Sequence, residues 1–572
     1  MSLVKKITNI IDSYRNIYRI VEIKKSSYFF VIILTFITVI LDALGISVLL
    51  PIGEYILNYH GGKIPNTPSW KIINKVFDFL TLETNVVVVI GFIIIIIILR
   101  QLFSYSRGLL IEKINFRSLM NLRKALFSKF FRRDFFFIKE YSTGSYNNVI
   151  ITESAKVGRA IVDPLEGLSA FILMISYLVL MFVISIKASL IVLCTILITG
   201  LLLKKLLSMI SKISKNIISI NDHFSQNLVD RLLAIKLIRI NNAISKENTI
   251  NDEILKKQYV NNVNLVKISI FSDSALEPFL LIIAIPVIFL SLTIGFPLAK
   301  LGVFIIVLAR LIPGFRTSIA LLQQITISFV SVQNMLMLIE KIDKQVEIRT
   351  GNLSAPKSIS SIVFNKVSYK YAKNKKNILN NFSCEIKGNC INAIIGSSGK
   401  GKTTLISMIP RLIEPQKGTI KINNVNTKNI DISSLRNMCS YIDQKPVFIR
   451  GTILDHLLYN TTHTNIEKCI ESAKLTNSDN FIRKLSGGYH HKLGESGAGL
   501  SGGQLQRIEI TRGIISEKPL IILDEPTNNL DGKSKSEILA LLQKIIKRKN
   551  ITILIVSHDK ETLKYCHNVI KI

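Results

Sequence analysis

The chain has 572 residues, of which 48% are hydrophobic, and its formal net charge is +33. This length is too great for one hydrophobic core, so it predicts two or more domains. Strong basicity is typical of nucleic-acid binders, but those proteins are rarely so apolar. The composition therefore argues against a nucleic-acid partner and favours a membrane protein with basic cytoplasmic loops.

Residues 1–26 form the first predicted element. Apolar residues such as Ile7, Ile10 and Ile11 alternate there with basic residues at helical spacing. We expect an amphipathic helix that lies along the membrane surface, and its basic side favours a cytoplasmic N-terminus.

Six apolar runs follow, each close to or above the ~20 residues that cross a bilayer. They cover about 28–52, 86–106, 164–185, 188–209, 268–294 and 297–320. The long connections after the second and fourth runs are rich in Arg and Lys, whereas the third and fourth runs and the fifth and sixth runs are joined by a few residues. Since basic loops stay inside, residues 27–340 are predicted to be an α-helical transmembrane domain with long cytoplasmic loops, and both termini are predicted to be cytoplasmic.

The apolar density falls after residue 340. The segment 341–360 is polar, contains Pro356 and is interpreted as a linker. Between 361 and 572, short β-like runs alternate with helical ones, which predicts an α/β domain.

A phosphate-binding motif identifies the ligand of this domain. The segment 396–404 fits G-x-x-x-x-G-K-[ST] between an apolar run at 391–395, which predicts a buried strand, and a predicted helix at 404–413. Its amide groups are therefore placed to surround the phosphates of ATP. Lys402 would reach the β- and γ-phosphates, and the Thr403 hydroxyl would hold Mg²⁺. The predicted ATP-binding residues of the loop are Gly396, Ser397, Ser398, Gly399, Lys400, Gly401, Lys402, Thr403 and Thr404.

Two acids end a second apolar run, 519–523. A carboxylate at the end of a strand beside the phosphates can hold Mg²⁺ through water, and we assign this role to Asp524. Glu525 is placed to polarise the attacking water.

The segment 500–504 reads Leu-Ser-Gly-Gly-Gln and precedes a predicted helix that runs to 515. Ser501, Gly502, Gly503 and Gln504 thus form a second anion-binding helix N-terminus. Together with the phosphate loop and the acid-ended strand, this segment resembles the signature of ATP-binding cassette (ABC) transporters. The likeness extends over nearly the whole chain, because six spans followed by one cassette are typical of exporter-type half-transporters.

The resemblance implies roles for three further residues. Tyr371 is similar to the aromatic residue that stacks on adenine, Gln444 to the glutamine that contacts Mg²⁺ and water, and His558 to the histidine that contacts the γ-phosphate. Pro526 and its neighbours depart from the usual exporter sequence, but no catalytic group is missing. The resemblance also implies that two cassettes clamp two ATP head to tail, in a homodimer or in a heterodimer with a degenerate partner.

The transported substrate is less specified, because a fold does not name its cargo. Arg310 lies inside the sixth run, where it either binds an anionic head group or pairs with Asp42, Asp273 or Glu277. Arg316 either joins it or reaches the inner interface. The first and sixth spans resemble those of lipid-linked oligosaccharide flippases, which implies an amphipathic, lipid-linked substrate and a bacterial-type inner membrane. Export of a peptide, bacteriocin or drug by the same ATPase is the alternative.

Overall fold

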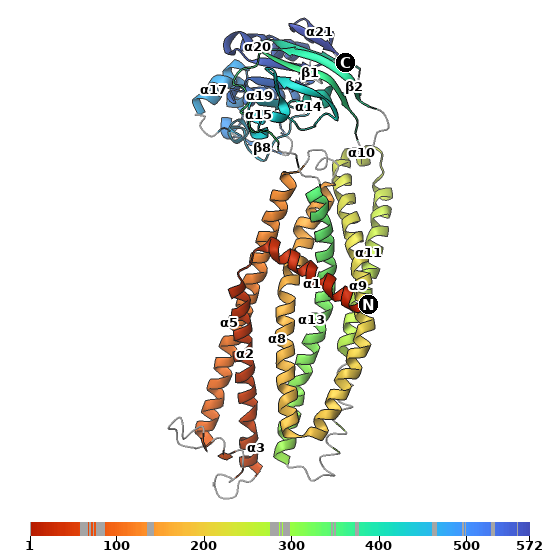
Figure 1. Cartoon of the computed structure of the whole chain (residues 1–572), viewed down its shortest axis with the longest axis vertical. Coiled ribbons are helices and arrows are strands. Elements are labelled where there is room, and N and C mark those ends of the chain that lie inside the picture. The colour runs from red at the N-terminus through yellow and green to blue at the C-terminus, as the bar shows by residue number, and fades with distance from the viewer. Residues whose placement is uncertain are drawn as a thin grey trace. The chain divides into compact units, whose positions relative to one another are not determined.

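The computed structural model describes residues 2–57, 67, 70–71, 74–75, 86–133, 142–274, 285, 289, 298–344, 347, 350–371, 377–397, 399–459, 461, 466–494, 497, 499–527, 532–557 and 559–572. The chain forms two compact units, Met1–Val346 and Glu347–Ile572 (Figure 1). The first unit is helical and the second is α/β, which confirms the predicted fold class.

Long helices running side by side make up the first unit (Figure 1). In chain order they are α1 (Ser2–Val21), α2 (Lys25–Ser47), α3 (Leu49–Leu57), α5 (Val86–Phe131), α7 (Thr143–Asn148), the π-helical turn η1 (Val149–Glu153), α8 (Ser154–Ile184), α9 (Ile186–Leu233), α10 (Ile235–Ile240), α11 (Ile244–Ser274) and α13 (Leu298–Lys344). The pairs α8 and α13, α2 and α5, and α9 and α11 make the most extensive contacts. Pro164 and Pro313 lie inside helices α8 and α13, as membrane helices tolerate.

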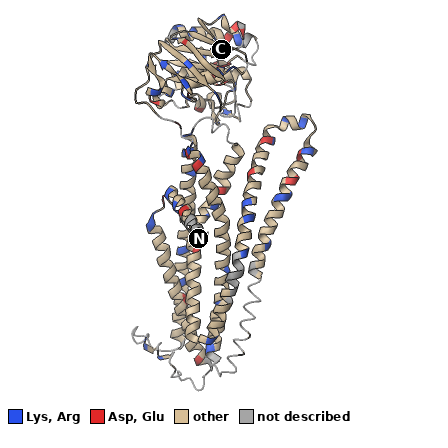
Figure 2. Ribbon diagram, turned by 45° about the vertical axis from the view of Figure 1, so that its right-hand side comes forward, with Lys and Arg blue, Asp and Glu red and all other residues tan. Residues whose placement is uncertain are grey.

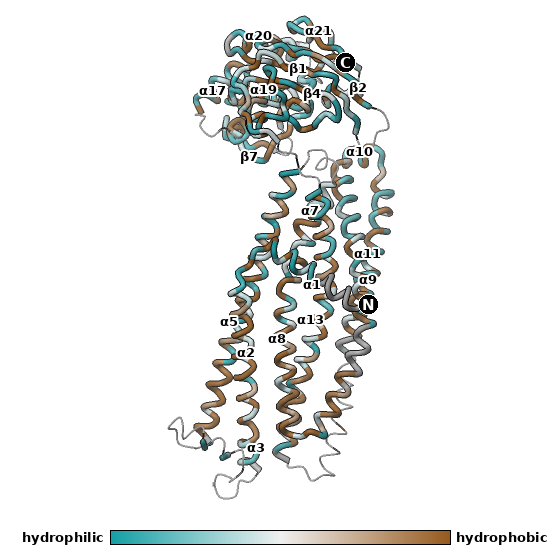
Figure 3. The backbone as a smooth tube through the Cα atoms, viewed as in Figure 1, coloured by the Kyte–Doolittle hydropathy of each residue, from teal (hydrophilic) through white to brown (hydrophobic). Residues whose placement is uncertain are grey.

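Four helical stretches in the described residues are long and apolar enough to cross a membrane: Lys25–Tyr55, Val87–Phe131, Thr143–Ile184 and Lys300–Lys344. They contain the predicted run at 28–52 and most of the runs at 86–106, 164–185 and 297–320. The run 188–209 lies in α9, and most of 268–294 lies outside the described residues. Charged residues gather on the upper halves of these helices in the view, and their lower halves are hydrophobic (Figures 2 and 3).

The N-terminal helix α1 packs against α5, α8 and α13. Ile17 and Val21 are fully buried beside Leu122, Leu126 and Val157. The hydroxyl of Tyr18 donates to the carbonyl of Ile161.

The second unit contains two larger sheets and a short pair. The strands are β1 (Ser361–Tyr369), β2 (Leu379–Lys387), β3 (Ile391–Ile395), β4 (Lys417–Ile422), β5 (Val425–Asn426), β6 (Cys439–Ile442), β7 (Gly451–Thr452), β8 (Lys492–Leu493), β9 (Leu520–Asp524), β10 (Thr552–Val556) and β11 (Asn568–Lys571). The order β2-β1-β4-β5 is antiparallel, and the order β11-β3-β10-β9-β6 is parallel.

The helices of this unit connect and cover the sheets. They are α14 (Lys402–Met408), η2 (Thr427–Asn429), α15 (Ile432–Asn437), α16 (Ile453–Leu457), α17 (Ile466–Leu475), α18 (Asp479–Lys484), η3 (Gly488–His490), α19 (Gly502–Ile515), α20 (Gly532–Lys549) and α21 (Lys560–Leu563). A core of Ile and Leu side chains from β3, β9, β10, α19 and α20 joins the parallel sheet to its helices. The carboxyl ends of β3 and β9 therefore lie at one edge of the sheet, where α/β proteins place ligands.

Helix α14 begins at Lys402 and ends at Met408, so it starts two residues before the predicted helix at 404–413 and stops five residues earlier. Ile409, before Pro410, still has helical φ and ψ of −63° and −53°, and Arg411 then leaves the helical conformation with a left-handed φ of +52°.

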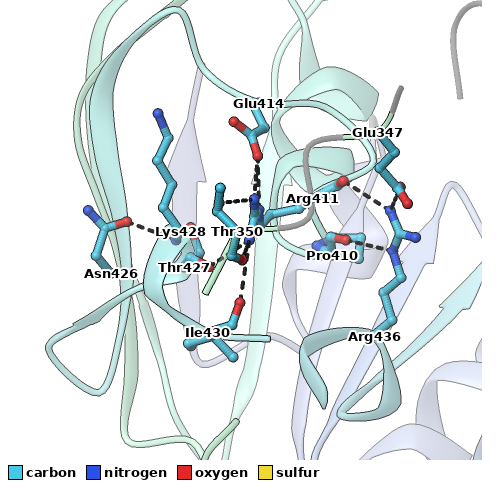
Figure 4. A network of polar contacts seen from close by, with 10 residues as sticks. All are labelled: Glu347, Thr350, Pro410, Arg411, Glu414, Asn426, Thr427, Lys428, Ile430 and Arg436. Atoms are coloured by element: carbon cyan, nitrogen blue, oxygen red, sulfur yellow. Dashed lines mark hydrogen bonds and ion pairs between the residues drawn. The ribbon is translucent and has the colours of Figure 1, made fainter. Parts of the chain in front are cut away.

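The predicted linker 341–360 divides between the two units. Residues 341–344 end helix α13, and the chain from Glu347 onward belongs to the second unit. Two arginines hold this entering segment (Figure 4): Arg411 donates to the carbonyl and hydroxyl of Thr350, each at 3.0 Å, and Arg436 pairs with Glu347. The fully enclosed Arg411 guanidinium also bonds Glu414 and the carbonyls of Thr427 and Ile430. The polar segment is thus fixed to the α/β unit immediately after α14.

Candidate functional site: the phosphate loop and its neighbours

The phosphate loop joins the end of β3 to the start of α14. Gly399 and Gly401 have φ of +80° and +92°, a conformation that side chains disfavour. A Cβ at Gly401 would lie 2.5 Å from Cγ2 of Ile378, so only glycine fits there. These turns expose the loop amides and the N-terminus of α14 to one place, which suits an anion.

Lys402 and Thr403 face the loop and the neighbouring strand. The Lys402 ammonium is buried and donates to the carbonyls of Gly396 at 3.0 Å and Ser397 at 3.3 Å. The Thr403 hydroxyl donates to Asp524 at the end of β9. Burial raises the pKa of Asp524 to about 6, an effect that the Thr403 hydrogen bond opposes. An ammonium, a hydroxyl and a desolvated carboxylate in contact are suited to phosphate and to a hard divalent cation.

The pair formed by Gln444 and Glu525 lies beside Asp524. Gln444, just after β6, donates through Nε2 to Oε2 of Glu525 at 2.6 Å. Glu525 has a φ of +47°, and its amide donates to the carbonyl of Val556 at 3.0 Å, so its position is fixed by β10. The structure thus brings together two residues that are 81 positions apart in the sequence.

Tyr371 lies over the beginning of α14. Its hydroxyl is 2.9 Å from the hydroxyl of Thr404, and its ring packs edge-on against Tyr369 at 5.2 Å. The aromatic residue assigned to adenine is therefore next to the phosphate loop.

The signature segment caps helix α19. The Ser501 hydroxyl accepts from the amide of Gln504 at 3.3 Å, and the Gln504 side chain accepts from the amide of Ser501 at 2.9 Å, which forms a capping box. Ser501 and Gly502 are exposed, and a Cβ on Gly502 would meet no atom within 4 Å. Among the described residues, no hydrogen bond or ion pair joins 501–504 to 396–404.

Two predicted site residues, Ser398 and His558, lie outside the described residues. The other predicted nucleotide-site residues fall into two groups: Tyr371, Gln444, Asp524 and Glu525 surround the loop, and Ser501, Gly502, Gly503 and Gln504 form the separate cap of α19.

The predicted substrate residues lie on α13. Arg310 and Arg316 are both exposed in the single chain. Their spacing places them ~120° apart around the helix axis. One partner suggested for Arg310 is engaged elsewhere: Asp42, which is buried, pairs with Arg100 on α5 at 2.6 Å and accepts a hydrogen bond from Tyr177 on α8. Glu277 is not among the described residues, and neither is the side chain of Asp273.

Arg100 and Tyr177 are the neighbours that sequence reasoning missed. The signal for Arg100 was its charge inside the apolar run 86–106, since a charge there needs a partner. Tyr177 carried no such signal, because a tyrosine in an apolar helix is common.

Two family models match separate parts of the chain, one in the helical unit and one in the α/β unit. The model described as ABC transporter transmembrane region matches residues 28–311, and the model described as ABC transporter matches residues 379–528. The two matches together cover well over half of the chain. The chain therefore belongs to the ABC transporters. It has the architecture of an exporter half-transporter, a multi-pass membrane protein whose ATP hydrolysis is coupled to transport.

Similar proteins include the ATP-dependent lipid A-core flippase of Legionella pneumophila (strain Philadelphia 1), which is 28% identical over 502 residues and aligns over 86% of this chain and 84% of the relative. The protein of the same name from Coxiella burnetii is 27% identical over 86% of this chain and 83% of its own. The heterocyst differentiation ATP-binding protein HepA of Nostoc sp. is 26% identical over 82% and 77%.

A solved structure of a bacterial Atm1-family ABC exporter with ATP bound has the same fold. The TM-score is 0.79, the sequence identity is 17%, and the match covers 96% of this chain and 94% of the other.

Proposed function

We propose that two copies of this chain use Mg-ATP to move an amphipathic lipid with an anionic head group, such as a lipid-linked oligosaccharide, across a bacterial inner membrane. The observation that carries this substrate class is the charge balance around Asp42. The names of the Legionella and Coxiella relatives support a lipid substrate.

The charge balance follows from the contacts of Asp42. This carboxylate is only 8% exposed, and it has Arg100 as its ionic partner and Tyr177 as its hydrogen-bond donor. The positive charge of Arg310 acts on the same Tyr177, so Arg310 lies near this group. One carboxylate between two guanidinium groups leaves a net positive charge among these four side chains. Because Arg310 is ~18 Å along α13 from Leu298, this charge lies within the apolar part of the helix and favours an anionic group there.

The separation of the two anion-binding faces supports the dimer. The loop 396–404 and the exposed cap 501–504 are both helix N-termini, yet no hydrogen bond or ion pair joins them within the described part of one chain. We propose that the cap of one chain faces the phosphate loop of the other, so that two ATP are enclosed. A homodimer would have two equivalent sites, and closure would require nucleotide.

Each residue of the site then has a distinct task. Lys402 binds the phosphates, Tyr371 stacks on adenine, and Thr403, Asp524 and Gln444 would hold Mg²⁺, which supplies positive charge to the phosphates. Glu525 orients and polarises water, and His558 contacts the γ-phosphate.

The substrate proposal is tested by ATPase stimulation in liposomes. The purified chain is supplied with a polyprenyl-diphosphate-linked sugar, lipid A, a hydrophobic peptide or a cationic drug. We expect stimulation by the two anionic lipids and a loss of that stimulation in Arg310→Gln. Lys300→Gln is the matched control, because it removes an exposed positive charge near the outer end of the same helix.

Two results would contradict the proposal. One is stimulation by peptides alone, which would favour a peptide exporter. The other is an Arg310→Gln chain that responds to anionic lipids as the unmodified chain does.

A further inference from the structure

A buried charged network lies behind the signature helix. His456 on α16 and Glu509 on α19 are 6% and 3% exposed, and Nε2 of His456 is 2.6 Å from Oε1 of Glu509. Arg512 donates through Nη2 to the other carboxylate oxygen at 2.6 Å. Both oxygens of Glu509 therefore have a partner, and neither the phosphate loop nor the catalytic pair uses these residues.

The network is rigid on the side of α16. A capping box fixes the start of this short helix: the amide of Asp455 donates to Thr452 at 3.1 Å, and the amide of Thr452 donates to Asp455 at 2.8 Å. Ile453 and Leu457 are fully buried in the hydrophobic cluster that also contains Ile508 of α19. His456 thus approaches Glu509 from a fixed position.

Helix geometry relates Glu509 to the signature. Glu509 follows Gly502 by seven residues, or almost two full turns, so the two lie on nearly the same face of α19. A rotation of α19 that moves Glu509 therefore turns the exposed amides at its N-terminus by the same angle. A hydrogen-bonded charge sets such an angle more narrowly than apolar packing does, because its contacts are directional.

One ring contact, followed by four residues of chain, leads from His456 toward the catalytic pair. The ring of Phe448 lies 4.4 Å from the ring of His456, centroid to centroid. Phe448 is four residues after Gln444, which donates to Glu525. Phe448 also borders the loop before the signature, since a Cβ on Gly497 would lie 3.2 Å from its ring.

We infer that His456, Glu509 and Arg512 form a positioning unit that sets the rotation of α19. The unit thereby sets the direction in which the cap at 501–504 faces ATP that is held by the second cassette. Phe448 connects the unit to the Gln444 segment of its own cassette. The inference rests on the proposed dimer. His456 is buried and contacts Glu509 and Phe448, so in this proposal it acts through α19.

The test uses the full chain in nanodiscs and compares substitutions that fill similar volume. His456→Leu and Glu509→Leu remove the hydrogen bond, whereas His456→Gln keeps a donor. We expect each Leu variant to raise the KM for ATP about tenfold, as for loss of a charge-assisted hydrogen bond, with kcat changed less than about twofold. Affinity for ADP, which reports the phosphate loop of the open cassette, should not change. His456→Gln should stay within about threefold of the unmodified KM.

The double variant His456→Leu/Glu509→Leu separates positioning from stability. Two apolar residues can replace a buried hydrogen-bonded pair without loss of stability, and Arg512, whose side chain is 28% exposed, can then reach water. The apolar pair supplies no directional contact. We expect its thermal stability to recover while its KM stays high. Glu517→Gln, a surface acid beyond the end of α19, is the control and should behave as the unmodified chain.

A double Leu variant with a normal KM would overturn the positioning unit, and so would single Leu variants that lower kcat and stability together without raising KM. Failure of the dimer is distinguishable from failure of the positioning unit. Without the dimer, the cassettes of two unmodified chains would show no ATP-dependent cross-linking to each other.

Discussion

Removal of Arg100 should expose the cost of an unpaired acid in the helical unit. In the unmodified chain, Nε of Arg100 is 2.6 Å from Asp42, whose side chain is 8% exposed. Arg100→Met keeps the length of the side chain and removes its charge. Of these two direct contacts, Asp42 then retains the hydrogen bond from Tyr177.

The magnitude follows from Coulomb's law. Two unit charges ~4 Å apart interact by ~4 kcal/mol at an effective dielectric constant of ~20. Breaking a buried pair from one side typically costs ~3–5 kcal/mol, and since Arg100 is 28% exposed we expect a value near the lower limit, ~3 kcal/mol. The double variant Asp42→Leu/Arg100→Met removes both charges of the ion pair, so it leaves no unpaired carboxylate, and it should lie within ~1 kcal/mol of the unmodified chain.

The assay is thermal inactivation of the purified chain in nanodiscs, read from ATPase activity that survives heating. Arg100→Met should lower the half-inactivation temperature by several degrees, and Asp42→Leu/Arg100→Met should restore most of that loss. If Arg100→Met inactivates at the unmodified temperature, or if the double variant is less stable than the single one, the ion pair does not have the role assigned here.

Three other outcomes are expected in the nucleotide-binding unit. Gly401→Ala should lower the thermal stability of the nucleotide-free chain more than Gly399→Ala does, because both alanines carry ~1–2 kcal/mol of left-handed strain but only the first meets Ile378; equal losses would contradict this. Burial raises the pKa of Asp524 from 3.8 to about 6, so between these pH values the native state binds a proton that the unfolded state has lost. The stability of the nucleotide-free chain should therefore fall as pH rises through this range, and Asp524→Asn should flatten that part of a profile of melting temperature against pH. Glu525→Gln should still bind ATP but lose ~100-fold or more of its turnover in a phosphate-release assay; normal turnover would remove Glu525 from the catalytic role.

Local motifs account for what could be predicted from the sequence. The phosphate loop is continuous from 396 to 404, and its glycines and Lys402 have their roles because of the turn they form together. The run at 391–395 predicted β3 with the observed bounds. Capping chemistry at Ser501 and Gln504 likewise needs only a spacing of three residues.

Long-range pairs could not be predicted in the same way. His456 and Glu509 are 53 residues apart, and each alone is typical of a solvent-exposed position. Arg411 resembled an ordinary basic residue of the predicted helix at 404–413, yet it is buried and binds the segment that enters the α/β unit. The antiparallel sheet was also missed, since Leu379–Lys387 mixes Asn, Ser and Glu with its apolar residues.

The contacts of Asp42 determine what the charges of the apolar helices can attract. From the sequence alone, Asp42 was a possible partner of Arg310, and that pairing would leave Arg100 as the unneutralised charge. The structure assigns Asp42 to Arg100 instead, at 2.6 Å, and holds it there with Tyr177. The excess positive charge is then displaced to Arg310 on the exposed side of α13. Among Asp42, Arg100 and Arg310, the guanidinium group that Asp42 does not contact is that of Arg310, and the proposed anionic substrate rests on this arrangement.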